Sequence, residues 1–184
     1  MNKLSENEQL EKARERVIDA IAQNINLYGV TESVGRLYGS LYFQDHPMTL
    51  DEMKDELGMS KTSMSTSVRG LMELKMVEKV WKKGERKDLY RAEMDWYQTF
   101  SDLFTIKWRT GVMANINAIE KSKKELNGLL SSDAIDDLVK QEAEKMIGKL
   151  DYALEYYDWL QRLVDSFESK EIFNYIPKKL ENTD

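Results

Sequence analysis

The sequence predicts a mainly α-helical protein with a small β-hairpin near its middle. The 184 residues hold only two prolines and nine glycines, so little interrupts long helices. Apolar residues recur at helical spacing on both sides of one short segment in which β-prone residues flank a polar turn. At this length the chain suits one domain with helical extensions.

The first two predicted helices are expected to pack closely. Residues 6–28 place apolar side chains near helical spacing, and Gly29 follows as a stop signal; these side chains are Leu10, Ala13, Val17, Ile21 and Tyr28. Thr31 and Glu32 open a second helix, in which Gly35 and Gly39 are one turn apart. Small residues at this spacing predict that another helix comes close to that face.

Two short helices follow, with a tight turn between them. Thr49 is predicted to cap the first helix in a capping box with Glu52. Gly58 supplies the turn, and Ser60 caps a second helix that extends to residue 75. The apolar face of this second helix is predicted to contain Met64, Val68, Leu71 and Met72. This arrangement predicts a helix-turn-helix.

A basic hairpin is predicted directly after the helix-turn-helix. The β-prone stretches VEKVW and DLYRA flank the polar run KKGERKD, in which Gly84 is available for positive φ. A helix-turn-helix followed by such a hairpin is a winged helix-turn-helix.

Two long helices complete the predicted fold. An apolar stripe runs from Tyr97 to Ile119 and predicts a helix over 95–127, which at about 1.5 Å per residue is on the order of 50 Å long. A heptad seam follows from 139 to 167, with apolar residues at alternating spacings of four and three. This seam requires a partner helix, and both the 95–127 helix and a second copy of the chain are candidates.

Charge along the chain points to nucleic acid as a partner. Residues 60–91 hold nine Lys or Arg and four acidic residues, a balance of +5, whereas the net charge of the chain is −6. The remaining residues therefore carry −11. A single basic segment in an acidic chain suits one phosphate-facing surface, although charged runs are also common on solvated surfaces.

The candidate DNA-binding residues lie in this basic segment. The major groove admits one α-helix, whose first turns reach base edges. Short hydroxyl and basic side chains of the required kind occupy one face of the 60–75 helix: Ser60, Lys61, Thr62, Ser63, Ser65, Thr66 and Arg69. The wing adds Lys82, Lys83, Arg86 and Lys87, which suit contacts to the minor groove or the backbone.

Aromatic residues gather where the wing joins the first long helix. A candidate effector site comprises Trp81, Tyr90, Trp96, Tyr97, Phe100 and Trp108. Several aromatic faces together bind a quaternary ammonium ion by cation–π attraction. The alternative is that these side chains fill a core or an interface.

Other classes of protein are disfavoured. His46 is the only histidine, and its neighbour Pro47 places it in a predicted turn, which disfavours Ser/His/Asp catalysis. One histidine and no cysteine exclude multi-histidine and thiolate metal sites within one chain. No phosphate-binding glycine loop occurs. We therefore expect no enzyme, no metal and no cofactor. No apolar run is long enough for a membrane span and no signal peptide is apparent, so we expect a cytoplasmic protein.

The middle of the chain resembles a known family. The runs YGVTESVGRLYGSLYF and PMTLDEMKDELGMSKTSMSTSVRGLMELKMVEKVWKKGERKDLYRAE resemble the GbsR-type repressors, a branch of the MarR superfamily. The resemblance covers residues 28 to 95 most strongly, with GRLYG, LGMSKTSMS and GERK as its most specific motifs. It implies a homodimer that binds an operator through two winged helices. It further implies control of genes for glycine betaine synthesis or osmoprotectant uptake, with choline as effector.

Two hypotheses for function follow. The first is a dimeric repressor that binds double-stranded operator DNA under the control of a small quaternary ammonium ligand. Its expected parts are an N-terminal dimerisation helix (1–30), a winged helix-turn-helix domain (31–94) and a long helical effector and dimerisation region (95–184). The second is a winged-helix protein-interaction module or transcriptional cofactor, for which the heptad seam is the working surface.

Overall fold

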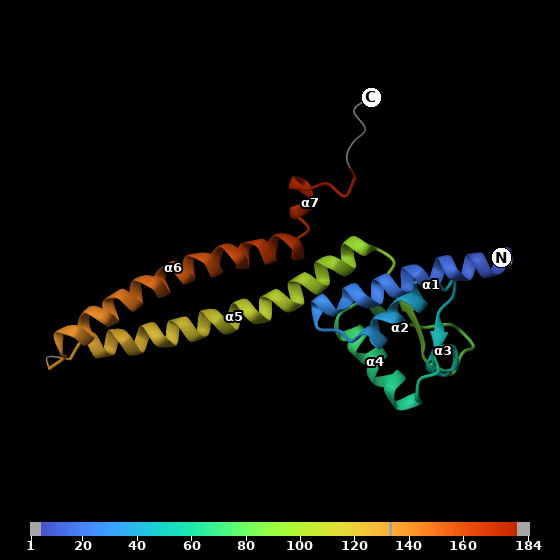
Figure 1. Ribbon diagram of the computed structural model, residues 1–184, viewed down its shortest axis with the longest axis horizontal. Coiled ribbons are helices and arrows are strands. Elements are labelled where there is room, and N and C mark those ends of the chain that lie inside the picture. Colours follow the sequence, from blue (N-terminus) through green and yellow to red (C-terminus); the bar gives the residue numbers. More distant parts are fainter. Residues whose placement is uncertain (1–4, 133, 180–184) are drawn as a thin grey trace, which may run out of the picture. The chain divides into compact units, whose positions relative to one another are not determined.

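The computed structural model describes residues 5–132 and 134–179, and these form two compact units that meet within one long helix (Figure 1). The first unit extends to Leu103 and the second begins at Phe104. The terminal segments 1–4 and 180–184, which the expected regions 1–30 and 95–184 include, lie outside the described residues. Among the described helices, none has the length and apolar character required to span a membrane.

The fold class agrees with the prediction: long helices and a small antiparallel sheet. The first unit contains α1 (Glu6–Asn24), a 3-10 turn (Ile25–Tyr28), α2 (Glu32–Tyr42), β1 (Met48–Thr49), α3 (Leu50–Leu57), α4 (Lys61–Glu73), β2 (Val77–Val80), β3 (Leu89–Ala92) and the start of α5 (Trp96–Leu130). The second unit contains the rest of α5, then α6 (Asp137–Glu168) and α7 (Ile172–Tyr175).

The helix-turn-helix has the expected capping. Thr49 and Glu52 form a complete capping box at α3, and Gly58 adopts φ 64° after it. Ser60 then caps α4 by accepting a hydrogen bond from the Ser63 amide over 3.2 Å. The predicted apolar face of α4 is correct at Met64, Val68 and Leu71, which are buried, and wrong at Met72, which is 38% exposed.

The wing is a hairpin of β2 and β3, to which a third strand is added. Val77 pairs with Ala92, Val80 pairs with Leu89, and Gly84 in the connecting loop has φ 92°. Strand β1 pairs antiparallel with β3 through Met48 and Tyr90, so the strand order is β1-β3-β2. Strand β1 has only two residues, which is too few to show the alternating pattern of a strand, and the sequence did not predict it.

Helices α1 and α2 pack closely at the two glycines of α2, as predicted. A Cβ placed on Gly35 would lie 2.5 Å from Ile25 Cγ2 and 2.8 Å from Ala22 Cα, which leaves room for no larger residue. The buried face of α1 is therefore Ile18 and Ala22, and Ile25 of the following 3-10 turn is buried beside them.

The expected apolar face of α1 needs correction. Leu10 is 61% exposed and Val17 is 44% exposed, although both belong to the apolar stripe that the sequence pattern predicts for this helix. The α2 glycines set which side of α1 packs, and Leu10 and Val17 lie outside that side.

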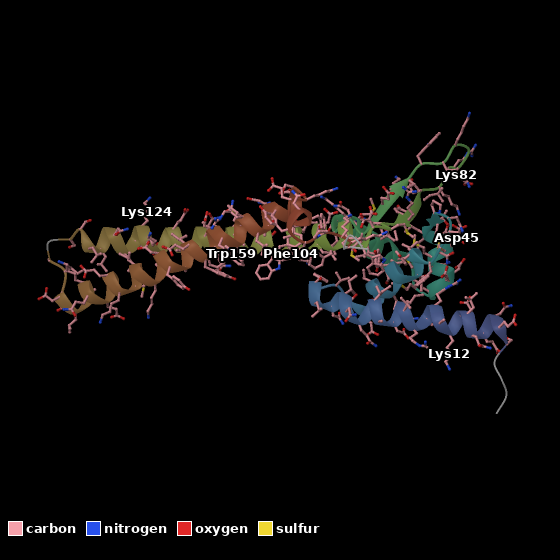
Figure 2. All side chains as sticks on the ribbon, turned by 90° about the horizontal axis from the view of Figure 1, so that it is seen from above. Lys12, Asp45, Lys82, Phe104, Lys124 and Trp159 are labelled. Atoms are coloured by element: carbon pink, nitrogen blue, oxygen red, sulfur yellow. The ribbon has the colours of Figure 1, made fainter. Side chains whose placement is uncertain are left out.

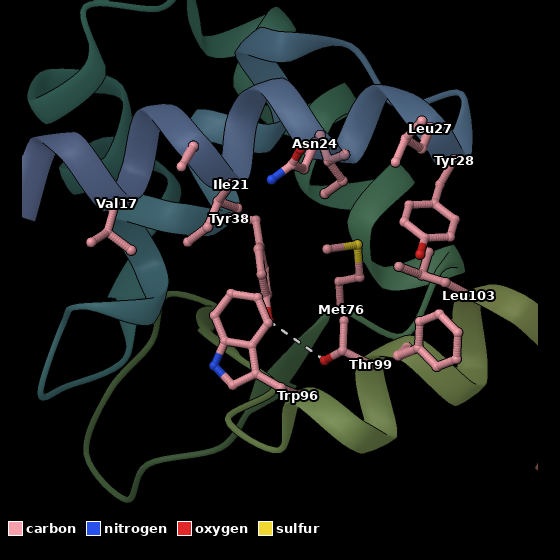
Figure 3. A pocket seen from close by; sticks show the side chains of 13 residues that line it. Val17, Ile21, Asn24, Leu27, Tyr28, Tyr38, Met76, Trp96, Thr99 and Leu103 are labelled. Carbon is pink, nitrogen blue, oxygen red and sulfur yellow. Dashed lines mark hydrogen bonds between the residues drawn. The ribbon is translucent and has the colours of Figure 1, made fainter.

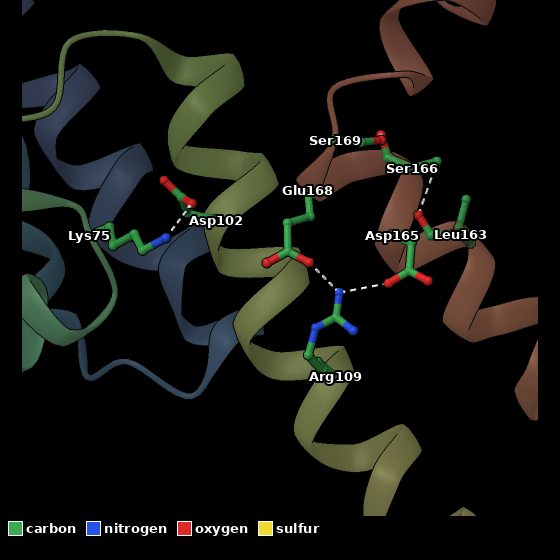
Figure 4. Close-up of polar contacts among 8 residues, drawn as sticks. All are labelled: Lys75, Asp102, Arg109, Leu163, Asp165, Ser166, Glu168 and Ser169. Carbon is green, nitrogen blue, oxygen red and sulfur yellow. Dashed lines mark hydrogen bonds and ion pairs between the residues drawn. The ribbon is translucent and has the colours of Figure 1, made fainter.

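In the second unit, α5 and α6 form an antiparallel hairpin within one chain (Figure 1). The rings of Phe104 and Phe167 are 4.6 Å apart. Arg109 binds Asp165 over 2.8 Å and also binds Glu168 (Figure 4). Further along the hairpin, Lys123 pairs with Asp151. The C-terminal part of the heptad seam, with Leu160 and Val164 buried, therefore packs within the chain. On the outer side of α6, Tyr152, Tyr156 and Trp159 are exposed.

Candidate nucleic-acid interface and ligand pocket

The outer face of α4 carries the predicted DNA-binding side chains. Its inner face is held in the core by Met64, Ser67, Val68 and Leu71. All seven predicted residues lie off this core: Ser65 is half-buried, and Ser60, Lys61, Thr62, Ser63, Thr66 and Arg69 are exposed. The helix thus presents a surface of hydroxyl and cationic groups to solvent.

The wing presents the remaining predicted cations. Every residue from Trp81 to Asp88 is exposed, including Lys82, Lys83, Arg86 and Lys87. Lys82 extends outward from the loop at the end of the hairpin (Figure 2). At the base of this loop, Lys79 pairs with Asp88 over 2.8 Å, and this hydrogen bond raises the pKa of Lys79.

One acidic residue joins α4 to the wing. Asp51, in the first turn of α3, accepts a hydrogen bond from Lys87 Nζ at 2.8 Å, and its other oxygen is 3.3 Å from Lys61 Nζ. The bond to Lys87, followed by that to Lys61, lowers the pKa of Asp51. The sequence interpretation missed Asp51 because an acidic residue in the first turn of a helix is already explained by the helix dipole.

A second candidate site is an apolar pocket of about 280 Å³ in the first unit (Figure 3). It is bounded by α1, the 3-10 turn after it, α2, the residue before β2 and the start of α5. Its lining comprises Val17, Ala20, Ile21, Asn24, Ile25, Leu27, Tyr28, Tyr38, Met76, Trp96, Thr99, Phe100 and Leu103. No charged side chain belongs to this lining.

Tyr38 contributes a buried hydroxyl to the pocket lining. Its hydroxyl donates to the Glu93 carbonyl over 3.1 Å and is 3.5 Å from Thr99 Oγ1 (Figure 3). Burial raises the pKa of Tyr38, so the phenol stays neutral. The ring also has an edge-on contact with Trp96, with centroids 6.1 Å apart. Tyr38 thus connects the pocket with the residue that follows β3.

The six aromatic residues of the predicted effector site are distributed over both units. Trp96 and Phe100 line the pocket. Trp81 is 83% exposed in the wing, Tyr90 is buried in the sheet, and Tyr97 is exposed at the start of α5. Trp108 lies in the second unit, 5.9 Å from Phe104.

Two pocket aromatics were absent from the sequence-based set. Tyr28 and Tyr38 belong to the N-terminal helices, far along the chain from the aromatic cluster that drew attention. The signal that would have found Tyr38 is its place within GRLYG, beside the glycines of the close helix pair.

The described residues contain no group of three His, Cys, Asp or Glu side chains arranged to hold a metal ion. His46 is exposed in the segment before β1.

Comparison with known proteins identifies relatives over almost the whole chain. Residues 96–174 match the family model of the GbsR family transcriptional regulator, C-terminal helical hairpin. The chain is 45% identical to the HTH-type transcriptional repressor GbsR of Bacillus subtilis (strain 168), over 91% of this chain and 93% of the relative. It is 42% identical to the HTH-type transcriptional repressor OpcR of the same organism, over 94% and 93%.

Solved structures with weaker similarity were also found. A crystal structure of a transcriptional regulator has 18% sequence identity and a TM-score of 0.47, over 83% of this chain and 99% of that one. A mutant of S. aureus MepR bound to an oligodeoxyribonucleotide has 15% identity and a TM-score of 0.39, over 80% and 92%.

The matched C-terminal segment coincides with the observed α5–α6 hairpin, and the relatives match the winged helix and this hairpin together. The chain therefore belongs to the GbsR family of transcriptional regulators and is a winged-helix DNA-binding regulator, not an enzyme.

Proposed function

We propose that this protein is a transcriptional repressor that binds operator DNA as a homodimer and responds to a small quaternary ammonium ligand. The repressors GbsR and OpcR, at 45% and 42% identity, support the first part. The observation that carries the proposal is the exposed hydroxyl and basic face of α4 beside an exposed basic wing. In a DNA-binding regulator these are the groups that bind bases and phosphates.

In the proposed complex, α4 enters the major groove. Arg69 is the side chain able to donate two hydrogen bonds to a guanine, and the hydroxyls from Ser60 to Thr66 bond to bases or phosphates with less selectivity. The wing residues Lys82, Lys83, Arg86 and Lys87 bind backbone phosphates and add affinity with little sequence preference. Specificity and affinity therefore come from different elements.

Gel shifts test this division. The probe is a duplex selected from a random-sequence pool with the wild-type protein, and a scrambled duplex serves as non-operator DNA. Arg69→Ala is expected to weaken operator binding about fivefold or more, because a bidentate pair contributes roughly 1–3 kcal/mol of discrimination. Lys124→Ala, at an exposed position of α5 in the second unit, removes the same charge as a control and should change nothing. Unchanged operator affinity in Arg69→Ala would contradict the role of α4.

The homodimer is proposed from the family and from the exposed apolar side chains that each unit leaves uncovered within one chain. In the first unit these include Leu10 and Val17 on α1, and in the second unit Tyr152, Tyr156 and Trp159 on α6. Two winged helices would then occupy half-sites about one helical turn apart. Sedimentation equilibrium should give twice the 21.5 kDa chain mass, and a mass of 21.5 kDa at micromolar concentration would contradict the dimer.

We further propose that the effector binds in the pocket of the first unit, and that it is choline or a related osmoprotectant. Four aromatic rings line this pocket, from Tyr28, Tyr38, Trp96 and Phe100. A trimethylammonium group cannot donate a conventional hydrogen bond, so an uncharged aromatic lining suits it through cation–π attraction. The regulated genes proposed with it are those for osmoprotectant uptake or synthesis, in the cytoplasm where the operator lies.

A choline titration followed by tryptophan fluorescence tests the pocket. The wild type should give a saturable change, and Trp96→Ala should weaken choline binding at least tenfold because one wall of the pocket is lost. Trp108→Ala is the matched control, since Trp108 does not line the pocket, and it should keep the wild-type affinity. A wild type that does not respond, or a Trp96→Ala variant with unchanged affinity, would contradict the proposed effector site.

A further inference from the structure

The hollow between α3, α4 and the wing brings together five charged side chains. It has a volume of about 320 Å³ and is lined by Thr49, Leu50, Asp51, Lys61, Arg86, Lys87 and Asp88. Three cations and two carboxylates therefore face one space. Asp88 pairs with Lys79 outside this lining, whereas Asp51 pairs with two of the three cations inside it.

We propose that this hollow binds a backbone phosphate of DNA, and that Asp51 is an internal competitor for the same two lysines. The proposal rests on the DNA-binding function proposed above and names a residue that limits binding through backbone phosphates. In the unbound protein, the Asp51 carboxylate takes the place that a phosphodiester takes in the complex.

The geometry supports an exchange of one anion for another. Each carboxylate oxygen of Asp51 serves one ammonium group: Oδ1 is 3.3 Å from Lys61 and Oδ2 is 2.8 Å from Lys87. A phosphodiester likewise offers two unesterified oxygens to the same pair of donors. Lys61 and Lys87 come from α4 and the wing, the two elements that approach DNA, so a single anion between them joins both elements.

Solvent exposure makes the exchange inexpensive. The side chains of Lys61 and Lys87 are 70% and 65% exposed, and that of Asp51 is 36% exposed. Ion pairs exposed to this degree contribute little to stability, so they break easily when a better anion arrives. The lysines cannot bind both anions fully at once, and every encounter with DNA must therefore displace Asp51 or place a phosphate close to it.

This competition acts on both kinds of DNA. Non-operator DNA binds almost entirely through phosphates, so a carboxylate beside the phosphate position reduces that binding directly. Operator DNA adds base contacts from α4, so it remains tightly bound despite the same loss. Asp51 therefore lowers both affinities and keeps binding that depends on phosphates alone weak.

The test compares Asp51→Asn with Asp55→Asn, which removes the same charge one helical turn further along α3, where the carboxylate pairs with Lys54. At about 0.1 M salt, Asp51→Asn should bind the scrambled duplex about three- to tenfold more tightly, with a gain of similar size for the selected operator. Asp55→Asn should change both affinities less than about twofold. Equal gains for the two variants, or unchanged or weaker binding by Asp51→Asn, would overturn the proposal.

A double-mutant cycle separates competition from simple charge. Lys87→Gln should weaken binding to the scrambled duplex in both backgrounds, but about threefold or more further in Asp51→Asn than in the wild type, where Asp51 already engages that lysine. Additive effects would overturn the proposal. Thermal melting checks that each variant folds, and Asp51→Ser replaces Asp51→Asn if the amide disturbs the helix start. A wild type that binds neither duplex would instead contradict the DNA-binding function itself.

Discussion

Gly35 shows how strongly a single residue determines the first unit. The nearest atoms to its missing Cβ include Ala22 Cα, a backbone atom that no rotamer change can move away. Gly39 lies against α1 less tightly, with Ile18 Cα 3.3 Å from its missing Cβ. Gly35 therefore places α1 and α2 at a separation that only a hydrogen side chain allows, whereas a methyl group at Gly39 would require a small shift of Ile18.

Gly35→Ala is therefore expected to destabilise the protein by about 1–3 kcal/mol, the usual cost of overpacking a close contact. Gly111→Ala is the matched control, because Gly111 is an exposed helical glycine of α5 with no atom within 4 Å of its missing Cβ. That control should be neutral or slightly stabilising, by up to about 1 kcal/mol. Urea denaturation measures both, and equal stability of the two variants would show that α1 and α2 are further apart than described.

Single residues also show where sequence reasoning reached its limit. The close helix pair was predicted from Gly35 and Gly39 because a small side chain has the same steric meaning in any context. The exposure of Leu10 and Val17 was not predicted. A stripe of apolar residues indicates that a helix packs against another surface, but it does not indicate whether that surface belongs to the same chain. Trp96 and Phe100 were predicted as ligand-binding residues because they belong to a cluster of aromatic residues in the sequence. The contribution of Tyr38 became apparent only from the fold, which brings α2 next to the start of α5.

At the scale of elements, the start of α3 depends on the capping box of Thr49 and Glu52. The Thr49 hydroxyl accepts from the Glu52 amide at 3.2 Å, and the Glu52 carboxylate accepts from the Thr49 amide at 2.6 Å. This last bond lowers the pKa of Glu52. Because Asp51 sits between these two residues, the box also fixes the position of the carboxylate that joins α4 to the wing.

Thr49→Ala should lower the free energy of unfolding by about 1 kcal/mol, the typical value of an N-cap hydroxyl. Thr31→Ala provides the comparison: Thr31 is the N-cap of α2, but its side chain makes no capping hydrogen bond, so its loss should cost only a few tenths of a kcal/mol. Chemical denaturation of both variants measures the difference. A Thr31→Ala variant as unstable as Thr49→Ala would contradict the assigned caps.

Elements with local signals were predictable, and elements made by pairing were not. The helix-turn-helix has caps and a Gly58 turn that act within a few residues, so its sequence contains the necessary information. Strand β1 consists of two residues that become a strand only when β3 lies beside them. The heptad seam predicted a helix that packs against another helix, but it did not predict which helix. Packing within the chain and packing between chains require the same heptad pattern.

At the scale of the whole molecule, a net charge of −6 coexists with a DNA-binding surface. The cations needed for phosphates are confined to α4 and the wing, and Asp51 holds two of them in the unbound protein. An acidic remainder disfavours unspecific attachment to nucleic acid through other faces. The charge distribution thus suits a regulator that must distinguish its operator from a large excess of other DNA.

The salt dependence of operator binding tests the central claim most directly, because it counts the phosphates that the winged helix engages. The logarithm of the affinity of the wild type should fall linearly with the logarithm of salt concentration, with a slope of about −0.9 for each phosphate neutralised. Lys82→Ala/Lys83→Ala should make this slope shallower by about two to four units in a dimer, while sequence preference persists. A complex insensitive to salt, or a slope that stays the same without the wing lysines, would contradict DNA binding by the wing and favour a protein partner for this surface.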